Sequence, residues 1–318
     1  MVKKYLGIDV GSVSIDFAVT DKSGNLIEKK YLRTQGQPIK IIKKGIKQLK
    51  EQLGEIKISG AGVTGSGRDL AGVMIGADVI KNEITAHAVA AGNLIPDVRT
   101  VLEIGGQDSK IIIIRNGIAV DFAMNTVCAA GTGSFLDQQA QRLGIPIEQF
   151  GQKALEAKAP VRIAGRCSVF AESDMIHKQQ LGYEKPEIIA GLCEAMVRNY
   201  INNVGKGKDI KSPVVFQGGV AANQGIKKAF EKELGLKIHV PDEYNVMGAI
   251  GAALLAKEEV NKKKAGTSFK GLDISEFDFK ADSFECDGCP NRCEVVNIYQ
   301  DNSLIARWGA KCPRWEAV

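Results

Sequence analysis

One strand–turn–strand unit occurs twice in the sequence. Each copy has an apolar strand that ends in a carboxylate, a glycine-containing polar turn and a returning strand: Tyr5 to Thr20 around DVGSVS, and Arg99 to Arg115 around GGQDS. Such turns can present backbone N–H groups to phosphate, and Asp9 can hold magnesium through water. Either copy alone is an ordinary hairpin, but the repeat is much more specific. It predicts two phosphate-binding hairpins within an α/β framework.

A further glycine-rich segment follows the strand Val214–Phe216. In QGGVAANQGIKKAFEKELG the strand ends at Gly218–Gly219 and a helix begins near Asn223. A helix N-terminus after a glycine pair suits the adenosine of a nucleotide. The pattern also predicts helices over Pro38–Leu53, Asn82–Leu94 and Asn245–Ala256, and a strand over Ile56–Ser59 before a glycine-rich loop, GAGVTGSGR.

Two cysteines each stand just before a predicted helix. Cys128 lies in NTVCAAGTGSFLDQQAQRLG, where Thr132 or Ser134 could cap the helix, and Cys167 precedes the helix Val169–Gln180. Together they could hold half of an iron–sulfur cluster, with a two-fold partner supplying the other half. Local sequence alone also allows the alternative of two buried structural thiols, because free cysteine is among the most buried residue types.

The C-terminal region holds another cysteine pattern. Cys286, Cys289 and Cys293 form C-x2-C-x3-C, and Cys312 follows after a predicted hairpin of strands Glu294–Gln300 and Leu304–Trp308. Four thiolates at this spacing predict a metal site, for which zinc and an iron–sulfur cluster both fit. The charged, weakly periodic segment 257–283 before it is expected to be a linker that Phe277 and Phe279 anchor.

Composition limits the class of protein. The net charge of +5 is too mild to predict a nucleic-acid partner. The N-terminus has no signal-peptide pattern and no apolar run reaches membrane-spanning length, so we expect a cytoplasmic protein without a membrane partner. In that reducing compartment the seven cysteines are expected to be metal ligands or free thiols rather than disulfides.

The order of the segments resembles the BadF/BadG/BcrA/BcrD ATPases. DVGSVS, SGAGVTGSGR, NEITAH, LEIGGQDSK, NTVCAAGTGSFLD, RCSVFAESD and QGGVAANQG carry the resemblance, which covers about residues 4 to 256. It implies an actin-like α/β fold with two ribonuclease-H-like lobes, 1–98 and 99–256, and nucleotide in the cleft. A linker, 257–283, and a cysteine-rich tail, 284–318, would follow. The tail is absent from short activators of the family.

The resemblance also implies a function. We expect a homodimer with one 4Fe–4S cluster held by Cys128 and Cys167 of each subunit, with the two following helices pointing their positive ends at it. Such a protein uses ATP, Mg²⁺ and the cluster to pass a low-potential electron to an iron–sulfur acceptor under anaerobic conditions. The acceptor would be a 2-hydroxyacyl-CoA dehydratase, a benzoyl-CoA reductase or a double-cubane cluster protein, and the donor a ferredoxin or flavodoxin-like protein.

Site residues follow from the matched motifs. Asp9, Glu103 and Gln107 are expected to be catalytic: Asp9 orients metal-bound water, Gln107 positions the attacking water, and Glu103 stands where the family often has Asp. The residues expected to contact ATP or ADP are Gly11, Ser12, Ser14, Gly105, Gly106, Gln107, Asp108, Lys110, Gly218, Gly219, Val220, Asn223 and Gln224.

Two other functions share this pattern. A sugar or N-acetylglucosamine kinase would need a substrate-facing catalytic Asp, where these loops offer cysteine and glutamine. A nucleotide-dependent scaffold would have a structural metal tail and no redox role. The helix Asn82–Leu94 also carries Glu83 and His87 four residues apart, which could be catalytic, cofactor-facing or simply packed.

Overall fold

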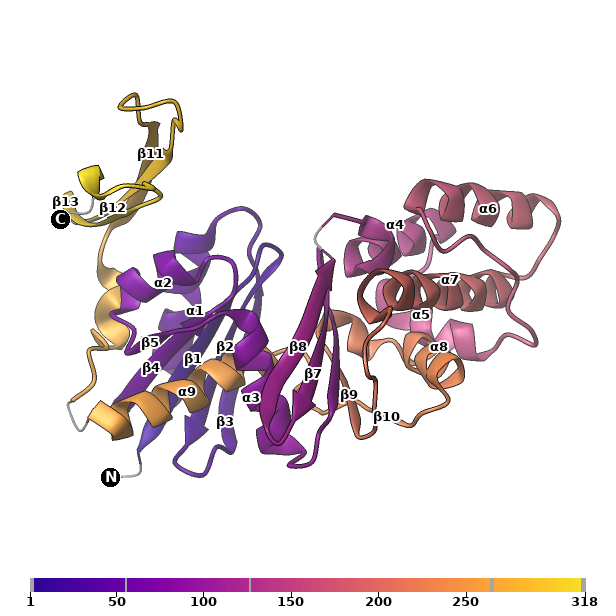
Figure 1. Cartoon of the computed structure of the whole chain (residues 1–318), viewed down its shortest axis with the longest axis horizontal. Coiled ribbons are helices and arrows are strands. Elements are labelled where there is room, and N and C mark those ends of the chain that lie inside the picture. The colour runs from indigo at the N-terminus through magenta and orange to yellow at the C-terminus, as the bar shows by residue number, and fades with distance from the viewer. Residues whose placement is uncertain (1–2, 55, 126, 264–265, 316–318) are drawn as a thin grey trace. The chain divides into compact units, whose positions relative to one another are not determined.

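The computed structural model describes residues 3–54, 56–125, 127–263 and 266–315. The chain divides into two compact units, Met1–Glu83 with Gly248–Val318 and Ile84–Met247, which we call the first and second unit. The sequence instead predicted lobes that met at residues 98 and 99, with the first lobe continuous. The first unit takes up the C-terminal segment because α9 (Met247–Lys263) packs on its sheet and Ile274 and Phe279 lie in its core (Figure 1).

The first unit is built on a mixed sheet in the order β3-β2-β1-β4-β5. Strand β1 is antiparallel to β2 and parallel to β4. The elements are β1 (Lys4–Val10), β2 (Ser14–Asp21), β3 (Leu26–Arg33), α1 (Pro38–Leu53), β4 (Ile58–Thr64), α2 (Arg68–Ile75) and β5 (Val79–Ile80). The predicted first hairpin and the helix over Pro38–Leu53 are therefore confirmed.

Strand β4 corrects one expectation. Gly60 to Thr64, predicted to belong to a glycine-rich loop, continue the strand. The glycines are there because α9 crosses the sheet at very short range: a Cβ on Gly62 would lie 2.2 Å from the carbonyl oxygen of Ala252, and one on Gly7 would lie 1.8 Å from that of Ala249. The small-residue helix thus packs closely on the core, as predicted.

The second unit repeats the sheet of the first. Its strands lie in the order β10-β9-β6-β7-β8. Read from the opposite edge, this is the order of the first sheet with β6 to β10 in place of β1 to β5. The strands are β6 (Thr100–Ile104), β7 (Ser109–Arg115), β8 (Ile118–Asn125), β9 (Val214–Gln217) and β10 (Ile238–His239). The repeat read from the two hairpins therefore extends to the whole sheet.

Helices of the second unit fill the long connection between β8 and β9 and flank the strands. They are α3 (Glu83–Leu94), η1 (Ala129–Gly131), α4 (Gly133–Leu143), α5 (Ile147–Leu155), α6 (Ser168–Gln180), α7 (Lys185–Tyr200), η2 (Ile201–Gly205), η3 (Gly219–Ala222) and α8 (Gln224–Leu234). Helix α7 lies at the centre of the core, where Leu192, Met196 and Tyr200 are buried. It therefore forms the scaffold on which the neighbouring loops are held.

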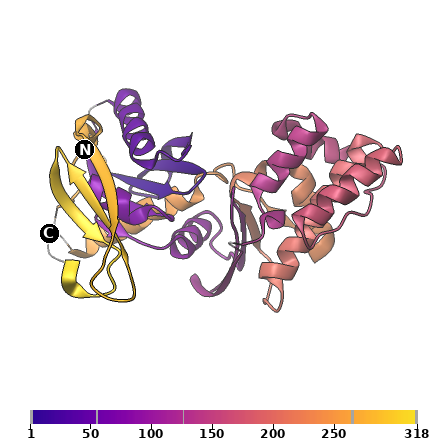
Figure 2. The ribbon, with the colours of Figure 1, turned by 90° about the horizontal axis from the view of Figure 1, so that it is seen from above.

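The segment that follows α9 belongs to the first unit and includes the cysteine-rich tail. It contains η4 (Leu272–Glu276), β11 (Phe279–Glu285), β12 (Glu294–Gln300), β13 (Ser303–Trp308) and η5 (Pro313–Trp315), with the strands in the order β11-β12-β13 (Figure 2). The segment 257–283 is thus not a loose linker: it holds the end of α9, η4 and most of β11. Ile274 and Phe279 are buried in the core of the first unit and anchor it there.

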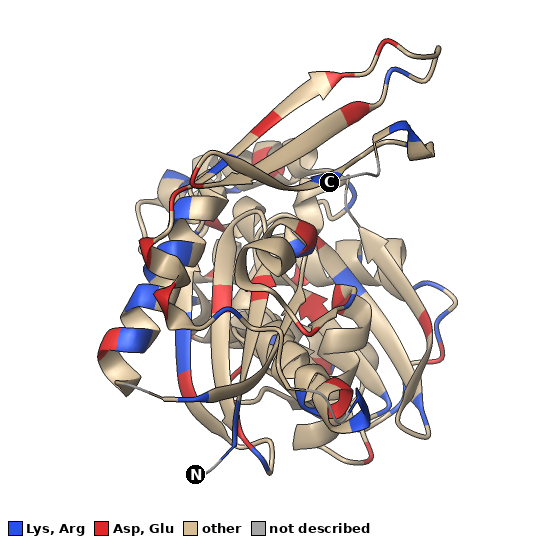
Figure 3. Cartoon of the chain, turned by 90° about the vertical axis from the view of Figure 1, so that its left-hand side faces the viewer, with Lys and Arg blue, Asp and Glu red and all other residues tan. Residues whose placement is uncertain are grey.

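Figure 3 shows Lys and Arg positions mixed with Asp and Glu positions along the ribbon. This distribution agrees with the mild net charge of +5. Within the described part of the chain, no helix is long and apolar enough to cross a membrane.

Candidate functional site

The turn between β1 and β2 contains the first predicted phosphate site. The N–H of Gly11 donates to the carbonyl of Ser14 at 2.9 Å, and Thr34 Oγ1 donates to the carbonyl of Gly11 at 3.1 Å. Ser12 is exposed at the tip of the turn. Hydrogen bonds from Gly11 and to Gly11 therefore fix the turn, and Ser12 is left exposed to solvent.

Asp9 lies at the end of β1 between two glycines. A Cβ on Gly248 would lie 1.9 Å from one carboxylate oxygen of Asp9, and a Cβ on Gly65 would lie 2.4 Å from the other. Gly65 also has φ of +89°, which favours glycine. Any side chain at either position would displace the carboxylate. Glycine at 65 and 248 therefore leaves room for the carboxylate of Asp9 beside the turn. Such a half-buried carboxylate suits a hydrated magnesium ion.

The β6–β7 turn holds the second predicted site, and its charged residues are paired with one another. Lys110 Nζ lies 3.0 Å from Glu103 Oε2 and 2.9 Å from Asp108 Oδ2. Lys110 and Glu103 are buried, whereas Gln107 is exposed at the turn. Glu103 and Lys110 thus stabilise the turn from within, and Gln107 is the side chain that the turn presents outward.

A buried polar row that the sequence did not predict runs beside this turn. Gln217 on β9 is the neighbour of Glu103 in the parallel ladder, and its Nε2 lies 2.7 Å from His87 Nδ1 on α3. Burial, and then the charge of Lys110, lower the pKa of His87 to about 3. His87 is therefore neutral and accepts from Gln217, which favours the packing interpretation of that histidine.

In the segment after β9, some of the residues that were predicted to contact nucleotide have a structural role. Asn223 caps α8, since its Oδ1 accepts from the N–H of Ile226 at 3.1 Å, and Val220 joins the hydrophobic core. Gly218 has φ of +87°, and a Cβ there would lie 2.6 Å from Glu103 Oε1. Gln224 is exposed. The backbone around Gly218 and Gly219 and the exposed Gln224 therefore remain the better candidates for nucleotide contact.

Cys128 lies in a loop that Asn125 closes. Asn125 Oδ1 accepts from the N–H of Cys128 at 2.9 Å, and its Nδ2 donates to the carbonyl of Cys128 at 2.9 Å. The thiol is free and half-buried, at the N-cap of η1. This loop therefore presents the sulfur at one defined place, just after the end of β8.

Helix α4 begins against the β6–β7 turn. Its first two amides, of Gly133 and Ser134, donate to the carbonyls of Gly105 and Gly106 at 2.8 and 2.9 Å, and Ser134 Oγ also donates to Gly106. Neither Thr132 nor Ser134 caps the helix through its side chain. The 3-10 turn η1 separates Cys128 from α4, so the N-terminus of α4 faces the β6–β7 turn rather than the thiol.

The loop that leads to Cys167 is attached to α7 at alternate residues. The N–H of Val161 donates to the carbonyl of Glu187 at 3.1 Å, Arg198 Nη2 donates to that of Ile163 at 2.7 Å, and Asn199 donates to that of Gly165. Cys167 then forms the N-cap of α6 with a free, half-buried thiol. Asn199 Nδ2 also lies 3.8 Å from Cys128 Sγ. The two thiol-bearing loops therefore meet at one side chain.

The four tail cysteines gather at one end of the small sheet without forming a ligand set. Glu285 pairs with Glu294 at this end, and the N–H of Cys286 donates to the carbonyl of Cys293 at 2.8 Å. Cys286 is buried, whereas Cys289 and Cys312 are exposed. In the part of the chain that the structure describes, no three Cys, His, Asp or Glu side chains are grouped as metal ligands.

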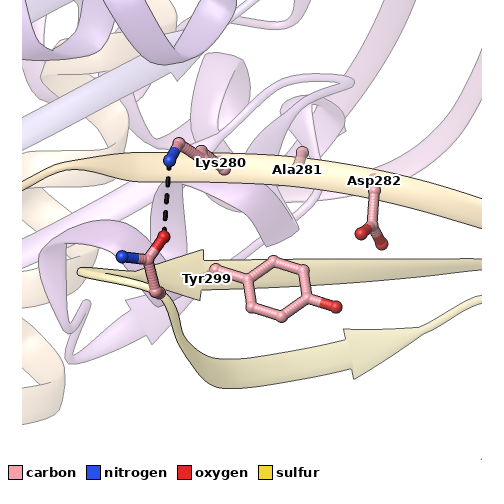
Figure 4. Close-up of a pocket in the computed structure, with 5 residues that line it drawn as sticks. Lys280, Ala281, Asp282 and Tyr299 are labelled. Carbon is pink, nitrogen blue, oxygen red and sulfur yellow. Dashed lines mark hydrogen bonds between the residues drawn. The ribbon is translucent and has the colours of Figure 1, made fainter.

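Trp315 fixes the end of the tail to Cys286. Its indole N–H lies 3.2 Å from Cys286 Sγ, and the N–H of Gly288 lies 3.5 Å from the same sulfur. These two hydrogen bonds, that from Trp315 first, lower the pKa of Cys286. An open hollow elsewhere on this sheet is lined by Lys280, Ala281, Asp282, Tyr299 and Asn302, and none of the predicted site residues lies there (Figure 4).

Comparison with known proteins decides the family. The model of the BadF/BadG/BcrA/BcrD ATPase family matches residues 6–256. The chain belongs to this family. It is 37% identical over 265 residues to the (R)-2-hydroxyglutaryl-CoA dehydratase activating ATPase of Acidaminococcus fermentans, a match that covers 81% of this chain and 98% of that protein. The residues after 256, which include the tail, lie outside the family match.

Similarity to solved structures confirms the predicted actin-like fold. The A. fermentans (R)-2-hydroxyglutaryl-CoA dehydratase component A has a TM-score of 0.75 at 33% identity, covering 81% of this chain and 99% of that one. The activator of 2-hydroxyisocaproyl-CoA dehydratase from Clostridium difficile, with bound ADPNP, has a TM-score of 0.72 at 30% identity, covering 83% and 97%.

Proposed function

We propose that this ATPase activates a partner enzyme by ATP-dependent delivery of a low-potential electron from a 4Fe–4S cluster shared between two copies of the chain. One observation carries the proposal: the glycine turn Gly105–Gly106 accepts hydrogen bonds from the helix that follows Cys128. A change at the phosphate turn would therefore move the start of α4 and, through η1, the loop of Cys128. The relatives named as dehydratase activators support the same reading.

Cys128 and Cys167 would hold the cluster. Both thiols are free and half-buried, and their loops converge on Asn199, as two ligands of one group require. Thiolates are the ligands that iron–sulfur clusters use, so the donor set fits. When bound, a 4Fe–4S cluster supplies a one-electron carrier at low potential.

A second copy of the chain would provide the other two thiolates. Apolar side chains are exposed at alternate positions of β8 and beside both cysteines, as an interface around the shared group would need. They are Ile118, Val120, Phe122 and Met124 on the strand, Val127 beside Cys128, and Val169 and Phe170 after Cys167. The homodimer proposal therefore rests on exposed apolar residues of the second unit that stand beside both cysteines in the sequence.

The phosphate turns would bind ATP or ADP with magnesium. Asp9 would orient metal-bound water, because Gly65 and Gly248 leave room for its carboxylate at the end of β1. Gln107 would position the attacking water, because it is the exposed side chain of its turn. Glu103 and Lys110 would act indirectly, since their ion pair fixes the turn's shape. The acceptor would be an iron–sulfur enzyme of the dehydratase or reductase type, and the donor a ferredoxin or flavodoxin-like protein.

The test is an anaerobic purification followed by a visible spectrum, an iron count and an electron-transfer assay. We expect a brown, oxygen-sensitive dimer in which the shared cluster accounts for about four irons and which reduces an acceptor only when ATP is hydrolysed. A colourless, iron-free chain after cluster reconstitution would reject the redox proposal and leave a kinase or a scaffold. Sugar-dependent ATP consumption would then distinguish these two.

We also propose a second metal centre in the tail, held by Cys286, Cys289, Cys293 and Cys312. The hydrogen bonds to Cys286 favour its thiolate form, and the exposed Cys289 and Cys312 would have to turn toward it. Zinc would make the centre a structural staple, and a 4Fe–4S cluster would make it an entry port for electrons. Metal analysis of the full chain, compared with its Cys289→Ser and Cys312→Ser variants, tests whether the tail binds metal and which one. Loss of about one zinc or four irons per subunit identifies the metal, and no loss rejects the site.

A further inference from the structure

Asn199 on α7 joins the two thiol-bearing loops. The residue is 2% exposed. Its Nδ2 donates to the carbonyl of Gly165 at 2.6 Å, lies 3.4 Å from that of Arg166, and is 3.8 Å from Cys128 Sγ. Its Oδ1 accepts from Asn203 Nδ2 at 2.9 Å. The side-chain amide of one buried residue thus donates to two segments, those of Cys128 and Gly165, that are more than thirty residues apart in sequence.

Two glycines allow the loops to come this close. A Cβ on Gly131, in η1 after Cys128, would lie 2.8 Å from Asn199 Oδ1. A Cβ on Gly165 would lie 2.7 Å from the carbonyl oxygen of Ala195 on α7. Larger residues at either position would push a thiol loop away from α7. The approach of both loops to Asn199 is therefore built into the sequence.

The two contacts of Asn199 differ in strength. The bond to Gly165 is short and belongs to the regular attachment of residues 161 to 165 along α7. The contact with Cys128 Sγ is longer, because sulfur is a large and weak hydrogen-bond acceptor. Asn199 therefore holds the Cys167 loop firmly and directs an N–H at Cys128.

We propose that Asn199 is a positioning residue that sets the spacing of Cys128 and Cys167 and donates a hydrogen bond to the sulfur of Cys128. This inference rests on the proposed cluster for its redox part only. A hydrogen bond to a cluster-ligating sulfur favours the more negative, reduced state, so it raises the reduction potential. Removing the amide should loosen both loops and shift the potential downward.

Hydrogen exchange on the metal-free chain tests the mechanical part. We expect Asn199→Leu to speed amide exchange in both 127–134 and 161–168, whereas exchange in α5 stays unchanged. Asn203→Ala is the matched control, because it removes the bond to Asn199 Oδ1 and leaves the donors in place. Faster exchange in only one of the two loops, or in neither, would overturn the link.

A redox titration followed by electron paramagnetic resonance tests the electronic part in reconstituted protein. Asn199→Leu should lower the midpoint potential of the iron that remains bound, and Asn203→Ala should leave it unchanged. Gly131→Ala gives a second route if Asn199→Leu does not fold, because the added methyl group moves the Cys128 loop off an intact amide. A purely structural role would reduce iron content without shifting the potential, which contradicts the proposal. A wild-type chain that takes up no iron rejects the cluster, while the exchange experiment still decides whether Asn199 links the loops.

Discussion

The N–H of Ser134 donates to the carbonyl of Gly106 at 2.9 Å, so the first turn of α4 is fixed to the β6–β7 turn. Gly133 makes the parallel bond to Gly105 at 2.8 Å. Because η1 alone separates α4 from Cys128, any shift of the glycine turn is passed to the thiol loop within a few residues. The proposed coupling of nucleotide to cluster therefore needs only contacts inside the second unit.

Gly133→Ala should break this coupling. The added Cβ would lie 2.9 Å from the carbonyl oxygen of Gly105, so the turn and the helix must separate. We expect ATP still to bind but no longer to change the cluster spectrum, with stability reduced by about 1–2 kcal/mol for the lost hydrogen bonds. Gln138→Ala, on the exposed side of α4, is the control. A normal ATP-dependent spectral change in Gly133→Ala would exclude this route.

Asp9→Ala should lower magnesium-dependent ATP turnover about 100-fold or more, because the metal-bound water loses its orienting carboxylate. Steady-state phosphate release measures this, with ADP affinity recorded in parallel to show that the nucleotide still binds. Asp69→Ala, an exposed carboxylate at the start of α2, should leave the rate unchanged. Equal rates in Asp9→Ala and wild type would remove Asp9 from the site.

Gln107→Ala should lower ATP turnover at saturating ATP about tenfold to a hundredfold, because the attacking water loses the side chain that positions it. The decisive measurement is the turnover rate at saturating ATP. A wild-type rate would show that Gln107 has no part in positioning water.

Cys128→Ser and Cys167→Ser should each abolish the shared cluster and weaken the dimer, while ATP still binds. Iron content and sedimentation measure both effects. Cys193→Ala is the matched control, because that thiol is buried in the core and burial raises its pKa to about 12. Full iron content in either serine variant would refute the ligand assignment.

His87 should make stability depend on pH. The unfolded chain binds a proton at this histidine below about pH 6.5, whereas burial and Lys110 lower its pKa in the folded chain to about 3. The free energy of unfolding should therefore fall as the pH drops from 7 to 5, with a slope of up to about 1.4 kcal/mol per pH unit from this group. His87→Gln should remove that slope, whereas His177→Gln, at an exposed position, should keep it. Identical slopes for wild type and His87→Gln would show that His87 does not cause the pH dependence.

The sequence could predict the parts of the fold that have local signals. Both hairpins follow from alternation and glycine turns, and α1 follows from its helical spacing. Helix α7 was missed although Glu184 and Glu187 form a capping box, and β8 was missed although its apolar residues alternate. Those two signals were present and could have been used.

The network around the thiols could not be predicted in the same way. Nothing local in the sequence of α7 shows that Asn199 faces the loops of two distant cysteines, since that depends on how the connection between β8 and β9 folds back. The same holds for the pairing of Gln217 with His87. Cys128 and Cys167 could be proposed from the sequence because their flanking motifs carry the family pattern, whereas Asn199 stands in no such motif.

The burial of Ile274 and Phe279 in the first unit affects how this protein can be produced. Relatives of about 265 aligned residues cover 81% of the chain, so cutting after α9 looks like an easy way to obtain a shorter ATPase. The cut would leave the apolar surface under η4 and β11 exposed to water, and it would remove Thr267 and Ser268, which donate to Asp78. A shortened chain should therefore be prone to aggregate during expression, and single cysteine substitutions in the whole chain are the better route to soluble material.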